Sequence, residues 1–163
     1  MIKIIYQLSN LLQFCSIKKE AFMNQSESIS HIMTKTVITV DERDGLSRVI
    51  ELLRKHNIRH IPVKNGKEIS GIISRTDINR LTFGTLFDNQ EDSDQAVLDM
   101  LSIPQVMTSK PRTVLSTASI KEIAEIFIHE EFHALPVVDE NGLSGIVTTT
   151  DVIKYLYKQF GKH

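Results

Sequence analysis

Two short segments of the chain hold the side chains whose types and spacing could do chemistry. At matching positions the two segments have two hydroxyl residues and an aspartate: Ser74, Thr76 and Asp77 in the first, and Thr148, Thr150 and Asp151 in the second. At the start of a helix, such oxygens cap the unpaired amides of the first turn. Hydroxyls beside those amides also favour an anionic ligand, and a carboxylate can accept hydrogen bonds from ligand hydroxyls. The residues alone leave both interpretations open.

Three more polar residues precede these segments. Arg59 and His60 stand before the first, and His133 stands before the second, where Ala134 takes the place of His60. They could contact an anionic ligand, or be surface or hydrogen-bonded strand residues. The six histidines show no metal-ligand spacing, and the chain has neither a Gly-rich phosphate loop nor a nucleophile elbow. We expect no metal site, and no enzyme activity, since too few residues lie around these segments for a catalytic domain.

The two segments belong to two copies of one unit. Residues 32–81 align with residues 106–155 at a constant offset of 74 and without a gap. The recurring residues include Met33 and Met107, Thr34 and Thr108, Pro62 and Pro136, and Gly71 and Gly145. Such self-similarity indicates a duplication. Because each copy must bury an apolar face that it cannot cover alone, we expect the copies to pack about a pseudo-twofold axis, so that any site between them occurs in two versions.

Each copy has the pattern strand, helix, strand, strand, helix. A β-branched run at 37–40 predicts the first strand, and apolar residues at helical spacing predict a helix that starts near Leu46, with a counterpart that starts near Ile120. Asp44 is the expected N-cap of the first helix, and Ser119 with Glu122 forms a capping box for the second.

Hairpins follow these helices. The strands are expected at 58–63 and 68–74 in the first copy and at 132–138 and 143–148 in the second, and further helices open at Asp77 and Asp151. The turns, at Asn65-Gly66 and Asn141-Gly142, are displaced by two places between the copies, which predicts a slight difference in register.

The residues outside the repeats fall into two parts. Residues 1–29 contain an amphipathic run from Ile2 to Cys15, which is too short and too polar to span a membrane. It is expected to dock on the core or on a dimer partner, unless translation begins at Met23. Residues 88–102 form an acidic linker or a docking element for a partner.

Composition limits the class of protein. The chain has 163 residues, 41% of them hydrophobic and 24% charged, and a net charge of -1, which leaves no basic surplus for nucleic-acid binding. Its single cysteine allows no internal disulfide, which fits a cytoplasmic protein. We expect binding to neither nucleic acid nor membrane.

The ordered motifs resemble the cystathionine beta-synthase (CBS) domain family, present as a tandem pair over 30–87 and 103–160. The matching motifs are Met33-Thr34 and Met107-Thr108, His60-Ile-Pro-Val63 and Ala134-Leu-Pro-Val137, and the Gly-to-Asp runs Gly71–Asp77 and Gly145–Asp151. The resemblance implies an α+β fold of two pseudo-twofold-related β-α-β-β-α repeats, packed as one Bateman-type module with up to two clefts. Family members bind AMP, ADP, ATP or S-adenosylmethionine in such clefts.

By this resemblance each cleft borrows the loop before the first strand of the opposite copy. One site would combine Ser74, Thr76 and Asp77 with Thr108 and Pro111, and the other would combine Thr148, Thr150 and Asp151 with Thr34 and Val37. The aspartate would bind the ribose hydroxyls, the hydroxyl residues a phosphate, and aliphatic strand residues the adenine. Arg59 and His60 would make the Asp77 cleft the more attractive one for an anionic ligand, with His133 as their counterpart.

The resemblance therefore implies a non-catalytic regulatory module that binds an adenine nucleotide as effector and signals occupancy to a regulated protein partner as a homodimer. Two alternatives stay open. One is a constitutive dimerisation or adaptor module whose clefts are empty, and the other is a sensor of S-adenosylmethionine.

Overall fold

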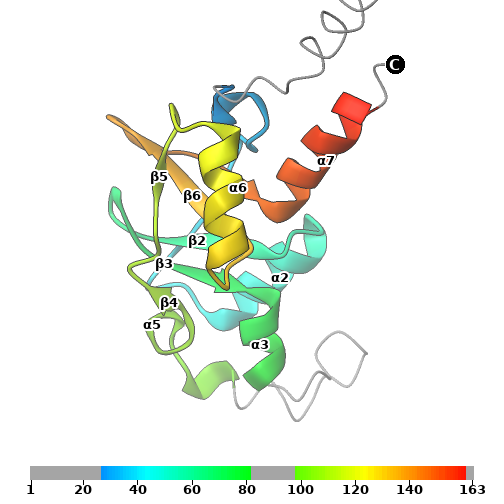
Figure 1. The fold of residues 1–163 in the computed structure, drawn as a ribbon. Helices are drawn as coiled ribbons and strands as arrows, with labels where there is room; N and C mark the ends of the chain where they lie inside the picture. Colours follow the sequence, from blue (N-terminus) through cyan, green and yellow to red (C-terminus); the bar gives the residue numbers. More distant parts are fainter. Residues whose placement is uncertain (1–26, 82–97, 161–163) are drawn as a thin grey trace, which may run out of the picture.

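The computed structural model describes residues 27–81 and 98–160 (Figure 1). The helix expected between Ile2 and Cys15, and most of the acidic linker, lie outside these residues. Within them, no helix is long and apolar enough to cross a membrane.

Both halves have the expected strand, helix, strand, strand, helix order. The first half comprises β1 (Val40–Asp41), α2 (Leu46–Lys55), β2 (His60–Asn65), β3 (Glu68–Ser74) and α3 (Arg75–Leu81). The second comprises β5 (Val114–Leu115), α6 (Ile120–His129), β6 (Ala134–Asp139), β7 (Gly142–Thr148) and α7 (Thr149–Phe160). Three short elements precede them in the chain: η1 (Ile29–His31) before the first half, and α5 (Ile103–Val106) and β4 (Thr108–Ser109) before the second.

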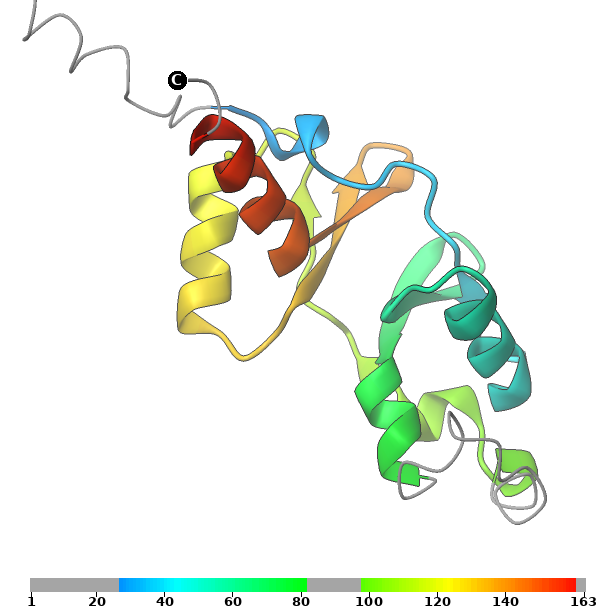
Figure 2. The same ribbon diagram turned by 90° about the vertical axis from the view of Figure 1, so that its right-hand side faces the viewer.

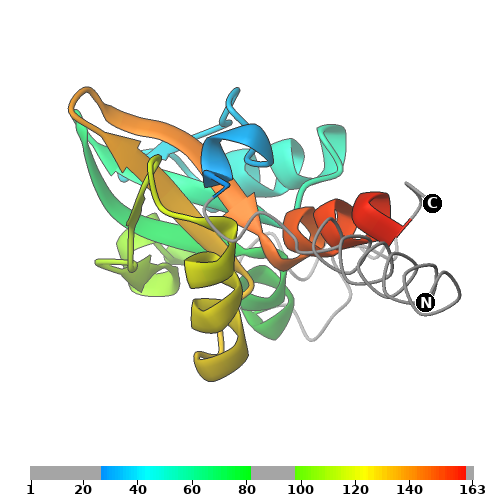
Figure 3. The same cartoon turned by 45° about the horizontal axis from the view of Figure 1, so that its top comes forward.

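The strands form two sheets, in the order β1-β2-β3-β4 and β5-β6-β7. Figure 3 shows the β6–β7 hairpin lying along the β2–β3 hairpin, and β3 contacts β7. The predicted difference in hairpin register is wrong, because Asn65 pairs with Glu68 and Asp139 with Gly142, at the same offset of 74 as the rest of the repeat. Both closing pairs enclose a two-residue loop, so the displaced glycine changes the turn and leaves the register unchanged.

The helix starts confirm one predicted cap and contradict the other. At α6 the Ser119 hydroxyl accepts a hydrogen bond from the Glu122 amide, and the Glu122 carboxylate accepts one from the Ser119 amide, which completes the capping box. At α2 the N-cap is Gly45, without a side-chain cap. Asp44 instead accepts a hydrogen bond from the Asp41 amide at 2.8 Å, so its carboxylate stabilises the turn before the helix.

Each hydrophobic core is completed by the segment that precedes the other half. Ile29 is fully buried in the core of the second half, and Ile103 is fully buried in the core of the first half. The two isoleucines are related by the offset of 74, so the repeat extends to the residues that cross over. Figure 2 shows this arrangement, with η1 against the second half and α5 against the first.

Backbone hydrogen bonds and two strand glycines also hold each leading segment against the opposite half. Thr34 and Ile146 exchange two backbone hydrogen bonds of 2.9 and 3.0 Å, and Thr108 pairs with Ile72 across β3 and β4. A Cβ added at Gly71 would overlap the Met107 side chain, and one added at Gly145 would overlap Met33. Strand glycines are therefore required where the methionine of the opposite segment packs directly on the backbone.

Candidate functional site

A cavity of about 810 Å³ lies where the two halves meet, and residues of both halves line it. Ten of the residues predicted from the sequence are among them: Thr34, Val37, Arg59, His60, Ser74, Thr76, His133, Thr148, Thr150 and Asp151. The predicted residues Asp77, Thr108 and Pro111 do not line it. The structure thus brings together the whole set expected for the Asp151 cleft, and adds groups from the first half.

Asp151 lies at the start of α7 and caps it. Its Oδ2 accepts hydrogen bonds from the amide of Thr148 at 2.9 Å and from the Thr148 hydroxyl at 2.6 Å. The Asp151 amide in turn donates to the Thr148 hydroxyl at 3.3 Å. Among the residues that the structure describes, Oδ1 of Asp151 has no hydrogen-bond partner. Capping therefore uses one carboxylate oxygen and leaves the other for a ligand that donates hydrogen bonds.

Asp77 repeats this local geometry outside the cavity. Its Oδ2 accepts hydrogen bonds from the amide and the hydroxyl of Ser74, at 2.8 and 2.6 Å. Thr108, which was expected to share a cleft with Asp77, lies exposed on β4, and Pro111 is half-buried in the loop that follows. The capping interpretation of both aspartates is confirmed, and ligand binding at either one stays a prediction.

Positive and titratable side chains from both halves face the cavity. Arg59, His60 and His133 line it, as does Lys154 of α7. From the sequence, Arg59 and His60 were expected to serve the Asp77 cleft. They line the cavity of Asp151, which Ser74 and Thr76 also line, and His60 pairs with Ser74 across β2 and β3. Their assignment to one aspartate stays a prediction.

His60 has a shifted pKa. Burial lowers the pKa of the ring, and repulsion from His133 lowers it further, while Asp77 opposes the shift. His60 is therefore neutral at neutral pH and can become a cation when an anion approaches. The ring lies within electrostatic reach of groups on both halves, so it responds to charge on either side of the cavity.

The cavity also has an apolar wall. Val37, Ile38, Ile58 and Ile146 contribute aliphatic surface from both halves. A flat apolar ring would bury its faces against such side chains, while its polar substituents reach the hydroxyls around Asp151.

Sequence reasoning missed six polar lining residues: Thr36, Asn57, Arg75, Asn79, Thr149 and Lys154. Lys154 follows Asp151 by three residues, so helical spacing on α7 could have placed both on one face. Asn79 had no such signal. Its Oδ1 is buried and has no hydrogen-bond partner among the described residues. The position of Asn79 at the cavity depends on how α3 packs, which no sequence pattern shows. Among all the residues that the structure describes, no group of three or more His, Cys, Asp or Glu side chains is placed to hold a metal ion.

Comparisons with known proteins agree with the duplicated architecture. The model of the CBS domain matches residues 29–83 and 103–158. The uncharacterized protein MJ1225 of Methanocaldococcus jannaschii is 30% identical over 135 residues, which cover 82% of this chain and 48% of MJ1225. The chain thus spans about half the length of this relative. The crystal structure of MJ1225 matches with a TM-score of 0.69 and 29% identity, over 82% of this chain and 49% of that one.

Two structures with bound ligands share the fold. The structure of CBSX2 of Arabidopsis thaliana in complex with AMP has a TM-score of 0.66 and 20% identity, and covers 81% of this chain and 97% of that one. The CBS domain pair of protein MJ0100, in complex with 5′-methylthioadenosine and S-adenosyl-L-methionine, has a TM-score of 0.65 and 24% identity, with the same coverage of 81% and 97%.

Proposed function

The chain belongs to the CBS domain family as a tandem pair, and we propose that it binds an adenine nucleotide in the cavity between its halves and signals occupancy to a partner protein. The observation that carries this proposal is one cavity that combines the available oxygen of Asp151 with Arg59 and His60 of the opposite half. A nucleotide needs both kinds of group, because it has hydroxyl donors at its ribose and negative charge at its phosphate.

The chemistry of the lining suggests how the ligand lies. The ribose 2′- and 3′-hydroxyls donate to Asp151, as they do to an acidic residue in dinucleotide-binding folds. The adenine packs on the aliphatic wall that includes Val37 and Ile146. The phosphate reaches across the cavity to Arg59 and His60, where charge-assisted hydrogen bonds form. The AMP complex of CBSX2 and the adenosyl complex of MJ0100 support this class of ligand.

Charge favours a nucleotide over S-adenosylmethionine. Arg59 and Lys154 bring positive charge to the cavity, and His60 can take up a proton there. The sulfonium of S-adenosylmethionine carries a positive charge, which these side chains repel, whereas a phosphate is attracted. AMP, ADP and ATP are therefore the first ligands to test.

Signalling would arise from a population shift. A ligand that contacts both halves stabilises the arrangement in which Asp151 and Arg59 face each other, and the free energy available for the output equals the difference in affinity between the two arrangements. The ligand acts as an effector, and no catalytic step is needed.

A second candidate, a constitutive adaptor module, is supported by the capping hydrogen bonds of Asp77 and Asp151. Because Asp77 and Asp151 each cap a helix, their presence has a structural explanation that needs no ligand. In that case the cavity would stay empty, and the module would serve only to hold partners together.

Isothermal titration calorimetry with AMP, ADP, ATP and S-adenosylmethionine distinguishes these functions, and Asp151→Asn with Asp77→Asn forms a matched pair. Asparagine keeps an oxygen for the cap and replaces the second oxygen by an amide donor. Asp151→Asn should weaken nucleotide binding by about tenfold or more, as expected for a lost charge-assisted hydrogen bond. Asp77→Asn should weaken binding much less, because Asp77 lies outside the cavity and acts on the ligand only through its charge beside His60.

Thermal unfolding gives an independent measurement. A ligand at about 100 times its dissociation constant adds about 2.7 kcal/mol to the stability of the wild-type protein. No binding of any of the four compounds would support the adaptor. Equal losses in the two variants would show that Asp151 is not the ribose ligand.

A further inference from the structure

A second hollow in the described part of the chain lies between β5 and α6. It has a volume of about 640 Å³ and shares no lining residue with the cavity between the halves. Residues of 112–118 line one side and residues of 122–130 line the other, and Figure 1 shows β5 and α6 beside each other. We call this hollow the β5–α6 groove. Leu115 and Ile126 give it an apolar surface, and Leu115 is 61% exposed.

This apolar surface follows from residues that differ between the two halves. In the first half, Ile38 packs against the core that includes Leu52, and Leu52 is only 6% exposed. At the matching positions of the second half, Arg112 forms an ion pair with Glu130, and Ile126 is only partly buried. The exposed Leu115 likewise replaces Asp41. The shared backbone therefore does not require an apolar groove, and an apolar surface of this kind marks a place where another group packs.

The chain enters the described structure at one end of the groove. The Ile29 amide donates a hydrogen bond of 2.9 Å to the Ala118 carbonyl, and the Ile120 amide donates one of 2.8 Å to the Glu27 carbonyl. Residues 27–29 thus run antiparallel to the start of α6. Because Ala118 also lines the groove, the segment that precedes Glu27 starts beside it.

The length of that segment is sufficient to reach any part of the groove. Residues 16–26 can span up to about 36 Å when extended. Helix α6 has ten residues and is therefore about 15 Å long. The amphipathic run from Ile2 to Cys15 can therefore lie along the whole helix.

The run and the groove also match in chemistry. The apolar residues of the run recur at helical spacing, and a run of this length is marginal as a helix unless its apolar face packs on another surface. Residues 1–22 contain three lysines and one glutamate, whereas the groove is lined by three glutamates and one arginine. On α6 these glutamates include Glu125, whose ion pair with Lys121 is exposed and 3.9 Å long, so it contributes little. Opposite net charges favour the approach of the segment to the groove.

We infer that the β5–α6 groove is the docking site of the N-terminal segment of the same chain. The apolar residues between Ile4 and Leu12 pack on Leu115 and Ile126, and the lysines of the segment lie toward the carboxylates of α6. Docking covers the apolar surfaces of both partners. This inference does not depend on nucleotide binding.

Hydrogen exchange of the full chain, expressed from Met1 and measured by mass spectrometry, tests the inference. The amides of residues 2–15 should exchange at least about tenfold more slowly than those of a synthetic peptide of the same sequence, because only docking protects them. Leu8→Asp in the segment and Leu115→Asp in the groove should each abolish this protection, since each places a charge in the apolar contact. Leu115→Asp copies the residue that the first half has at this position.

Two matched variants serve as controls. Gln7→Asp changes a polar residue of the segment, and Ile128→Asp changes an exposed residue of α6 that does not line the groove. Both should keep the protection within about twofold. Circular dichroism checks that every variant is folded.

A spin label gives the position of the segment independently. Cys15 is the only cysteine of the chain, so Gln13→Cys with Cys15→Ser provides a single site for a nitroxide label. The label should broaden the amide signals of β5 and α6 in NMR spectra more than those of β1 and α2, the matching elements of the first half.

Several results would overturn the inference. Exchange of residues 2–15 as fast as in the free peptide would mean that the groove has another occupant. Protection that survives Leu115→Asp, or broadening stronger at β1 and α2, would place the segment elsewhere. Protection that is lost on dilution would show that a second copy supplies the segment.

Discussion

The two halves of this protein share a backbone and differ in what their side chains do. Ile29 and Ile103 cross over in the same way and are equally buried. In contrast, Asp151 lines the cavity and Asp77 does not, although the hydrogen bonds around both carboxylates agree within about 0.1 Å. Identical local structure therefore gives different chemistry, because the cavity depends on what the opposite half contributes.

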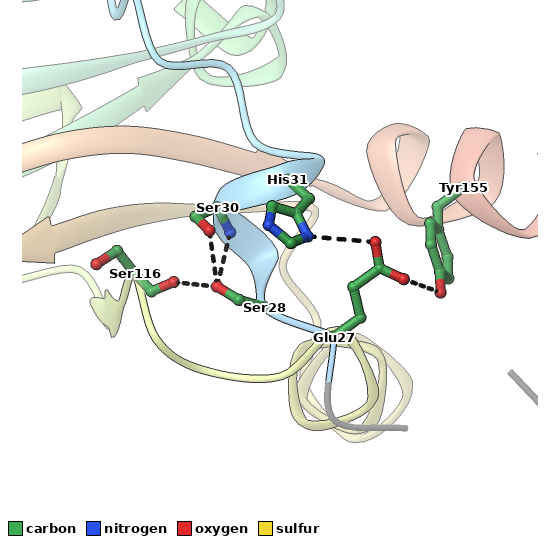
Figure 4. A network of polar contacts seen from close by, with 6 residues as sticks. All are labelled: Glu27, Ser28, Ser30, His31, Ser116 and Tyr155. Carbon is green, nitrogen blue, oxygen red and sulfur yellow. Dashed lines mark hydrogen bonds and ion pairs between the residues drawn. The ribbon is translucent and has the colours of Figure 1, made fainter. Parts of the chain in front are cut away.

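A second pair of positions shows the same divergence. In the second half the Tyr155 hydroxyl donates a hydrogen bond of 2.7 Å to Glu27, and Glu27 also contacts His31 (Figure 4). At the corresponding positions of the first half, Leu81 and Leu101 pack against the core. At this pair of positions one half contacts its leading segment through a hydrogen bond and the other through apolar side chains. The halves should therefore respond differently to equivalent substitutions.

The largest loss of stability is expected at Ile29 and Ile103, each of which is buried in the core of the opposite half. The two halves should lose similar amounts of stability. Ile29→Ala and Ile103→Ala should each lower the free energy of unfolding by about 2–4 kcal/mol, because each leaves a cavity in a packed core. Chemical denaturation measures the loss. Hydrogen exchange should show faster opening of α6 for Ile29→Ala and of α2 for Ile103→Ala. Faster opening of α2 for Ile29→Ala and of α6 for Ile103→Ala would mean that the leading segments do not cross over in solution.

The next effect is expected where glycine meets methionine. Gly145→Ala should destabilise the protein by about 1–3 kcal/mol, because the added methyl group overlaps Met33. In a Met33→Ala background the same substitution should cost much less, since the overlapping side chain is gone. Met107→Ala, the equivalent change for the other half, is the control, and its effect should add to that of Gly145→Ala. Additivity with both methionine variants would contradict the contact.

The polar contact of Tyr155 and Glu27 should have a smaller effect. Burial and the Glu27 carboxylate raise the pKa of Tyr155, so its hydroxyl stays protonated and donates at neutral pH. Tyr155→Leu or Glu27→Leu should each cost about 1–2 kcal/mol of stability, because each removes the hydrogen bond between the two side chains. The double variant, which copies the leucines of the first half, should be less destabilised than the two single effects summed. Strict additivity in denaturation experiments would show that the two residues are uncoupled.

The sequence was sufficient to predict the elements and most of one cleft. Apolar spacing predicted α2 and α6, and the strand Glu68–Ser74 was predicted to the residue. The elements follow from local periodicity and from the offset of 74, which the sequence shows directly. The grouping of Thr34 with Asp151 followed from the family resemblance alone, because only the resemblance implies that the leading loops are exchanged between the copies.

The wrong predictions concern contacts that only the folded chain defines. Asp44 had the right residue type for a cap, but the Asp41 amide competes for its carboxylate. Asn79 is buried through packing of α3, and no pattern around it signals this.

The smallest effect is the expected dependence of nucleotide affinity on pH. It depends on His60, whose counterpart in the second half is Ala134. Burial, with repulsion from His133, holds the pKa of His60 below its ordinary value of about 6.5. Without ligand, the folded state thus binds fewer protons than the unfolded state, and stability is lost as the pH falls below about 6.5. A bound phosphate favours the protonated ring, so nucleotide binding takes up a proton. Affinity should rise about three- to fivefold between pH 7.5 and pH 6.

Calorimetry at several pH values measures this dependence, with His60→Asn and His133→Asn as a matched pair. The phosphate of the nucleotide has an ionisation near pH 6, but its effect is common to every variant and cancels in ratios to the wild type. His60→Asn should flatten the rise in affinity. His133→Asn removes a repulsive neighbour, which raises the pKa of His60 and moves the rise to higher pH. If His60→Asn kept the full dependence, the proton would be taken up elsewhere, and His60 would not face the phosphate.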